Sequence, residues 1–233
     1  YLPRGTYAIG APVVVRGGVQ RILGMDSRIR GLTGAQPIWR IGDGAAPGVI
    51  LERLDLDYAS SSTLAIEHAT RRPLVVRQAT LHGYRNTVPG GSVFLDDVCG
   101  TSWRFQGQTV WARQLNPEAM AAPAFNVEAD GSRLWLFGLK TEGPQAAVRA
   151  TASQVELWGG FFYASRGVQP DTAAIELRGG SLLGSWVNHR GDANGPGALF
   201  APQLRVWADG RITELHLASG SDTRAVVVAP ARD

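Results

Sequence analysis

Short apolar runs alternate with turn residues along the whole chain. The runs at 12–15, 49–58 and 74–81 are rich in Val, Ile and Leu, and Gly, Pro, Asn or Asp separates each run from the next. Runs of this length and composition are typical of β-strands. Long helices are disfavoured, because they need Ala, Leu, Glu and Lys where this chain has glycine. The pattern predicts an all-β protein.

The apolar runs recur with a regular period. Pairs of runs begin about 21–30 residues apart, and five tryptophans are separated by 24, 23, 28 and 21 residues: Trp111, Trp135, Trp158, Trp186 and Trp207. Two or three short strands per unit of this length are expected for one coil of a parallel β-helix. A propeller blade needs about 40 residues, and a sandwich has no such longer period. We therefore expect a solenoid of about seven or eight coils.

Glycines mark the expected corners of these coils. Gly-Gly pairs occur at 17–18, 90–91, 159–160 and 179–180, where a tight corner between sheets needs positive φ. A bend at Gly138 would reset the inward and outward alternation, so that Leu134, Leu136 and Leu139 could all point inward. We expect one domain over 1–233, with coils at 1–190 and a loop and capping C-terminal strands at 191–233.

Composition narrows the classes of partner and cofactor. The formal net charge is +3, and the sequence has no long run of Lys and Arg, so no nucleic-acid partner is predicted. All but one of the 23 basic residues are arginine, which a GC-rich genome would explain. The single cysteine, Cys99, excludes an intrachain disulfide. No apolar run reaches the ~18 residues of a membrane-spanning helix. Nothing in the sequence indicates an oligomeric state.

Four segments resemble a known family. Residues 1–7 read Tyr-Leu-Pro-Arg-Gly-Thr-Tyr, like the entry segment of the pectate-lyase superfamily, and residues 111–118, 134–143 and 157–163 resemble a glycoside-hydrolase-like bacterial branch of it. The resemblance implies a single-stranded right-handed parallel β-helix that binds or acts on polysaccharides. It also implies an extracellular or periplasmic location and a missing helical segment before Tyr1.

Asp55 and Asp57 are the first candidate catalytic pair. Residues at i and i+2 of a strand share a face, with Cα atoms roughly 6.5–7 Å apart. This is near the carboxylate separation of inverting glycosidases, about 6.5–9.5 Å. The same pair could ligate Ca²⁺, which is the only metal the sequence raises, although no complete metal site is predicted. A solvated sheet face, with the two aspartates alternating with Leu54 and Leu56, is the simpler explanation.

Asp96 and Asp97 resemble the adjacent aspartates of polygalacturonase-type enzymes. Neighbouring residues of a regular strand point to opposite faces, so both can serve one site only where the backbone bends. The other motifs of those enzymes are absent. A turn at the end of the run at 93–95 is the alternative explanation.

Alignment of the second half of each repeat predicts a groove. It places Asp55 and Asp57 beside Thr80 and His82, followed by the pairs Trp111/Arg113 and Lys140/Glu142. The predicted catalytic residues are Asp55, Asp57, His82, Arg113, Lys140 and Glu142, and the predicted substrate-binding residues are Trp111, Asp96 and Asp97. Carboxylates, cations and an aromatic side chain together suit a saccharide.

Three functions fit these features. A polysaccharide hydrolase or lyase would place two carboxylates in one groove, whereas a non-catalytic carbohydrate-binding protein would not need the pair. A structural or assembly element, such as a spike or a filament, would show a polar surface and contacts between copies. The sequence leaves the choice open, and with it the question of whether the protein is an enzyme.

Overall fold

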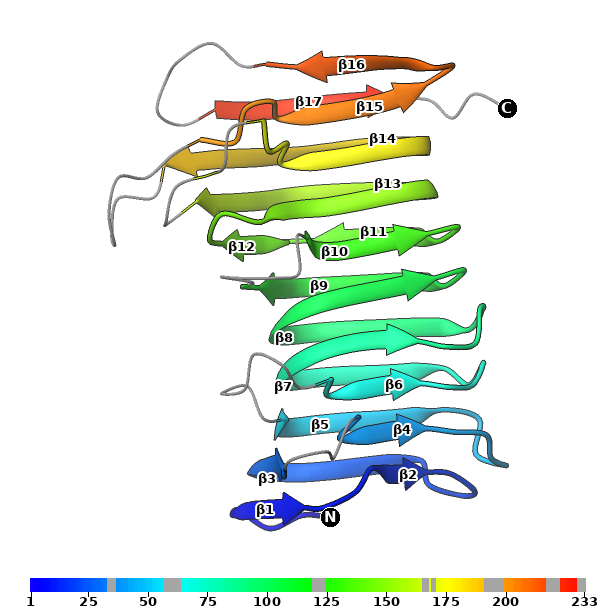
Figure 1. Ribbon diagram of the computed structural model, residues 1–233. Coiled ribbons are helices and arrows are strands. Elements are labelled where there is room, and N and C mark those ends of the chain that lie inside the picture. The colour runs from blue at the N-terminus through cyan, green and yellow to red at the C-terminus, as the bar shows by residue number, and fades with distance from the viewer. Residues whose placement is uncertain are drawn as a thin grey trace.

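The computed structural model is an elongated stack of β-strands (Figure 1). It describes residues 1–32, 37–56, 64–118, 125–164, 168, 171–190, 199–216 and 223–229. Within these residues the chain contains seventeen strands and no helix. The predicted all-β class is therefore confirmed, and the described residues contain no helix that could span a membrane.

The strands follow one another up the stack in chain order, except for the last strand, which turns back and is drawn below the one before it. They are β1 (Thr6–Ile9), β2 (Val13–Val15), β3 (Arg21–Gly31), β4 (Trp39–Ile41), β5 (Val49–Leu56), β6 (Ile66–His68), β7 (Leu74–Asn86), β8 (Ser92–Gln106), β9 (Thr109–Pro117), β10 (Phe125–Asp130), β11 (Arg133–Phe137), β12 (Lys140–Glu142), β13 (Ala146–Ala164), β14 (Ile175–Arg190), β15 (Leu204–Ala208), β16 (Arg211–Leu215) and β17 (Thr223–Ala229).

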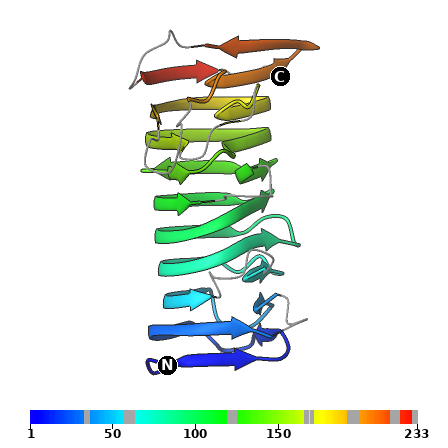
Figure 2. The same cartoon turned by 60° about the vertical axis from the view of Figure 1, so that its left-hand side comes forward.

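Most strands pair in parallel with the strand that lies one circuit of the chain further on. Arg28 of β3 pairs with Asp55 of β5, Asp55 with Thr80 of β7, and Thr80 with Cys99 of β8. Residues of successive circuits therefore stand above one another in columns, about 4.8 Å apart. Figure 2, turned by 60°, shows the same stacking from another side. Only β14–β17 and β15–β16 pair antiparallel among the described strands, at the C-terminal end of the stack.

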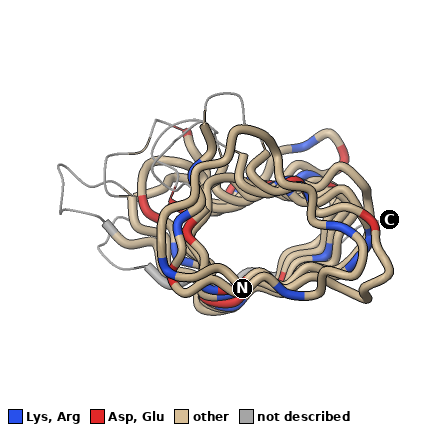
Figure 3. The backbone as a smooth tube through the Cα atoms, turned by 90° about the horizontal axis from the view of Figure 1, so that it is seen from below, with Lys and Arg blue, Asp and Glu red and all other residues tan. Residues whose placement is uncertain are grey.

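The predicted fold class needs a correction. We expected an open, single-stranded right-handed parallel β-helix of seven or eight coils, with glycine corners between separate sheets. All seventeen strands instead belong to one hydrogen-bonded sheet, and Figure 3 shows its backbone closing around a common interior. The fold is thus an all-β, closed and mainly parallel sheet.

The physical reason for the difference is that many strands bend without ending. β8 has 15 residues and β13 has 19, and both continue through residues with positive φ. Several of these corner residues are not glycine, such as Arg53 and Asp97, both with φ of 54°. A glycine pattern therefore cannot find every corner, since Asp and other polar residues also adopt this left-handed conformation.

Each left-handed residue resets the side-chain alternation. In β5, Val49 and Leu51 are buried before Arg53, and Leu54 and Leu56 are buried after it. The apolar residues thus face the interior on both sides of the corner. Gly138, with φ of 74°, does the same between Leu136 and Leu139, both fully buried, which confirms the predicted phase change.

Candidate functional site

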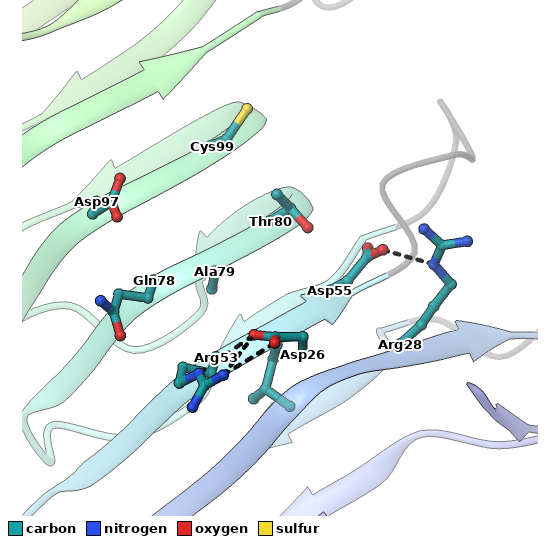
Figure 4. Close-up of a pocket in the computed structure, with 10 residues that line it drawn as sticks. Asp26, Arg28, Arg53, Asp55, Gln78, Ala79, Thr80, Asp97 and Cys99 are labelled. Carbon is teal, nitrogen blue, oxygen red and sulfur yellow. Dashed lines mark hydrogen bonds and ion pairs between the residues drawn. The ribbon is translucent and has the colours of Figure 1, made fainter. Parts of the chain in front are cut away.

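A polar groove of about 820 Å³ lies on the outside of the stack, where β3, β5, β7 and β8 bend. Its walls come from four neighbouring circuits of the chain, as Figure 4 shows. The lining residues are Asp26, Arg28, Arg53, Leu54, Asp55, Gln78, Ala79, Thr80, Asp97 and Cys99. The groove is larger than a second cavity of about 310 Å³, and charged and polar groups converge on it, so it is the candidate site.

Two columns of side chains build this groove. The first column stands at the corner itself and contains one left-handed residue from each strand: Asp26, Arg53, Gln78 and Asp97, with φ of 56°, 54°, 49° and 54°. The second column lies two residues further along each strand: Arg28, Asp55, Thr80 and Cys99. The same pair of positions, i and i+2, therefore repeats on four adjacent strands, and the residue between the two positions is buried on each strand.

Two ion pairs hold the lower end of the groove. The Arg53 guanidinium donates through Nη2 to both carboxylate oxygens of Asp26, at 3.2 and 3.0 Å. Arg28 Nε donates to Asp55 Oδ2 at 2.7 Å. These contacts link strands β3 and β5 and fix the direction of both carboxylates (Figure 4). Since the pairs are partly solvated, they orient the groove more than they stabilise the fold.

The upper end of the groove carries fewer charges. Gln78 and Asp97 are exposed, and Thr80 and Cys99 are half-buried in the second column. These residues offer an amide, a carboxylate, a hydroxyl and a thiol within one concave surface. The groove as a whole can both donate and accept hydrogen bonds.

Asp55 and Asp97 are the predicted site residues that line the groove. Asp57 lies outside the described residues. Asp96, the neighbour of Asp97, lies on the other side of the corner and accepts two hydrogen bonds from Arg113, at 2.8 and 3.0 Å. Because Asp97 is left-handed, the backbone does bend between the two aspartates, as a shared site would require, yet only Asp97 reaches the groove.

The predicted alignment of the repeats is wrong above Thr80. Cys99 follows Thr80 in the column, and Asn116 follows Cys99, where we had placed Trp111 and Arg113. The alignment missed a whole circuit, because β8 and β9 belong to two successive circuits that we had counted as one repeat. Val93 pairs with Val110, a circuit of 17 residues and shorter than any predicted repeat.

Trp111 lies on the neighbouring face, in a stack of aromatic rings. Its ring lies 4.7 Å from Phe94 and 5.3 Å from Trp135, with interplanar angles of 7° and 8°. Both faces of the Trp111 indole are therefore covered by other rings, and neither is open for stacking on a sugar. The ring stack stabilises the sheet, and offset-stacked pairs of this kind contribute about 0.5–1.5 kcal/mol each.

The other three predicted residues do not line the groove: His82 lies further along β7, and Lys140 and Glu142 lie on β12, higher in the stack. His82 is buried and hydrogen-bonded to Thr101. Lys140 binds both Glu142 and Glu118, the second at 3.0 Å. Partial burial opposes the charge of Lys140, but the hydrogen bonds to Glu142 and Glu118 outweigh it and raise the pKa of the ammonium. Lys140 is therefore a poor proton acceptor near neutral pH.

Three glutamates away from the groove have lowered pKa values. Burial favours the protonated forms of Glu52 and Glu67, but hydrogen bonds from Arg77 and Arg21, and from Arg85 and Arg40, outweigh it and lower both pKa values. Glu214, at the C-terminal end, also has a lowered pKa because Arg205 and His216 bind it. None of these three residues lines the groove.

Metal ligands do not gather in the described residues. No group of three or more His, Cys, Asp and Glu side chains converges there, so the Ca²⁺ that the sequence raised stays a prediction.

Sequence reasoning also missed the groove residues Asp26, Arg28, Arg53 and Gln78. The sequence does carry a signal for these four residues, because each is followed by another polar residue either two positions later or one circuit later. This pattern can be recognised only when the length of each circuit is known.

The resemblance to the pectate-lyase superfamily gained no support from known proteins. No protein-family model, curated protein or solved structure matches the chain. The function therefore has to be argued from the groove itself.

Proposed function

We propose that the protein binds an uncharged oligosaccharide or polysaccharide in the groove and acts by binding rather than by cleavage. The observation that carries this proposal is the repeat of one polar pair, at i and i+2, on four stacked strands. Such a pair recurs about every 4.8 Å along the stack. A surface with a short regular repeat suits a polymer with a regular repeat.

The chemistry of the lining supports a ligand rich in hydroxyl groups. Carboxylates accept two hydrogen bonds from neighbouring hydroxyls, and guanidinium, amide and hydroxyl groups donate to hydroxyl and ring oxygens. The ion pairs of Asp26 and Asp55 already fix these groups, so little side-chain entropy is lost when a ligand binds. The three aspartates and two arginines of the groove leave no excess of positive charge to attract an acidic sugar.

Binding is favoured over hydrolysis by the contacts of the carboxylates. An inverting or retaining glycosidase needs two carboxyl groups that both face the scissile bond of the substrate. Asp55 receives a guanidinium hydrogen bond at 2.7 Å and Asp26 a bidentate one. Both carboxylates are thus already engaged by arginine side chains. We accordingly place the protein among carbohydrate-binding proteins, outside the cell or in the periplasm, where polysaccharides are met.

A panel of neutral oligosaccharides tests the proposal by titration calorimetry. We expect at least one member to bind the wild type, and Thr80→Tyr to weaken its binding at least about tenfold, because the ring fills the groove. Thr109→Tyr is the matched control, since Thr109 is half-buried on the neighbouring face beside Trp111 and should change the affinity less than twofold. Equal loss in both variants, or no binding by any member, would overturn the proposal.

A second readout separates binding from catalysis. The same panel is incubated with the wild type, and new reducing ends are measured. The proposal predicts none, because Asp26 and Asp55 are each held by an arginine. Release of reducing ends that is lost in Asp97→Asn would replace the binding function with a hydrolase.

A further inference from the structure

A column of alternating charges runs up a different face of the molecule. Each residue is the register partner of the next, from Arg40 of β4 to Glu214 of β16: Arg40, Glu67, Arg85, Arg104, Glu128, Arg149, Glu176, Arg205 and Glu214. We call these nine residues the charge column. Its side chains face outward, on strands whose alternate residues are buried.

The alternation has a clear electrostatic effect. Glu67 lies between Arg40 and Arg85 and binds each at 2.6 Å, although its own side chain is only 4% exposed. Glu128 binds Arg104 at 3.3 Å and Arg149 at 3.8 Å, and Arg149 also binds Glu176 at 3.2 Å. Opposite charges that face each other on neighbouring strands stabilise a sheet, and like charges destabilise it.

The charge column breaks its alternation at one place. Arg85 of β7 and Arg104 of β8 are direct register partners, with their backbones about 4.8 Å apart. Within the charge column they are the only neighbours of like charge. The column holds five arginines and four glutamates, so it is one acidic group short of full alternation, and the shortage falls between these two residues.

A second cavity, of about 310 Å³, lies at this break. Arg85 and Arg104 line it together with three uncharged polar side chains and two acids: Asn86, Gln106, Thr151, Glu128 and Asp130. Glu128 already binds two arginines, and Asp130 stands two residues along the strand from the charge column. The acids in the cavity wall therefore do not replace the missing acidic group.

Both arginines keep donors for a ligand. A guanidinium carries five N–H donors. Arg85 uses Nε and Nη2 toward Glu67, and Arg104 contacts Glu128 through Nε. The exposed side chains can thus turn further donors into the cavity without losing these ion pairs.

We propose that this cavity binds an oxyanion, namely a carboxylate, sulfate or phosphate group, that bridges Arg85 and Arg104. The bound group takes the place of the missing glutamate and completes the alternation. Two guanidinium forks present parallel N–H donors, the geometry that matches the paired oxygens of such groups. The oxyanion site is separate from the groove, and it does not depend on the proposed saccharide binding.

Titration calorimetry with simple anions tests this site. Sodium sulfate, phosphate, acetate and glucuronate are compared with chloride at constant ionic strength, so that general screening cancels. We expect saturable binding of at least one oxyanion. Binding of the inorganic ions identifies a site for a free tetrahedral anion, whereas binding of acetate and glucuronate alone identifies a site for a carboxylate carried by a larger ligand. No difference from chloride for any of the four overturns the proposal.

Two variants locate the binding. Arg104→Gln removes one of the two bridging guanidinium groups and should weaken oxyanion binding at least about tenfold. Arg40→Gln is the matched control, because it also removes one arginine–glutamate pair of the charge column but leaves the Arg85–Arg104 pair intact, so its affinity should stay within twofold. If Arg104→Gln does not fold, Arg104→Lys keeps the charge and should still bind, but more weakly. Oxyanion binding that is equally strong in all variants would overturn the proposed site.

Discussion

At the scale of single residues, the interior of the stack holds a buried polar network centred on His68. Its Nδ1 contacts the Tyr84 hydroxyl at 2.9 Å, and its Nε2 contacts the Arg72 carbonyl oxygen at 2.8 Å. The Tyr84 hydroxyl donates to Gln108 Oε1, and Gln108 Nε2 donates to His68 Nδ1 at 3.2 Å. Burial is the largest influence on His68 and lowers its pKa below 6.5, so the imidazole is neutral in the folded protein at pH 7.

This network predicts a pH dependence of stability. Unfolded His68 regains a pKa near 6.5, so below that pH the unfolded state binds a proton that the folded state does not. The contribution of His68 to the free energy of unfolding should therefore be complete above pH 6.5. It should be lost progressively as the pH drops toward 5. We expect chemical denaturation of His68→Gln to show a shallower fall over this range. Parallel curves for the two proteins would exclude His68 as the cause.

At the scale of elements, the left-handed corner residue decides how a strand continues. The sequence predicted corners at Gly-Gly pairs, and Gly90, Gly91, Gly179 and Gly180 do have positive φ. It could not predict the corners at Asp26, Arg53, Gln78 and Asp97, because these residue types are equally common within ordinary polar faces. The groove residues were missed for the same reason, since they stand at these corners.

The corner at Gln114 offers a test of this local strain. Gln114 is exposed, has φ of 52°, and lies outside the groove. A β-branched side chain in the left-handed region costs about 1–2 kcal/mol, whereas glycine adopts it freely. We expect Gln114→Val to lower the free energy of unfolding by this amount and Gln114→Gly to leave it within about 0.5 kcal/mol. Equal effects of the two substitutions would contradict a left-handed corner.

At the scale of the whole molecule, the period and the apolar alternation predicted stacked circuits of strands around one interior. They did not predict that the sheet would close as one unit, since closure depends on strands that continue through non-glycine corners. The candidate site was predictable only in part. Asp55 and Thr80 are register partners as expected, but the alignment missed the next circuit, in which Cys99 is the partner of Thr80.

The arginine content also gains a structural explanation at this scale. The sequence offered no role for it beyond genome composition. In the structure many arginines are register partners of acidic residues, as in the charge column and in the pairs Arg77–Glu52 and Arg113–Asp96. Their planar forks bind carboxylates on neighbouring strands, which a lysine cannot do in a bidentate manner.

The central claim is that the groove is the saccharide site, and Cys99 tests it most directly. This single cysteine is half-buried in the groove wall, so the rate of its alkylation measures how accessible the groove is to the reagent. We measure the rate of iodoacetamide labelling by mass spectrometry with increasing saccharide. Occupation of the groove predicts that labelling slows along the same concentration curve as the calorimetric binding. Saturable binding with an unchanged labelling rate would show that the saccharide binds elsewhere, and would contradict the account.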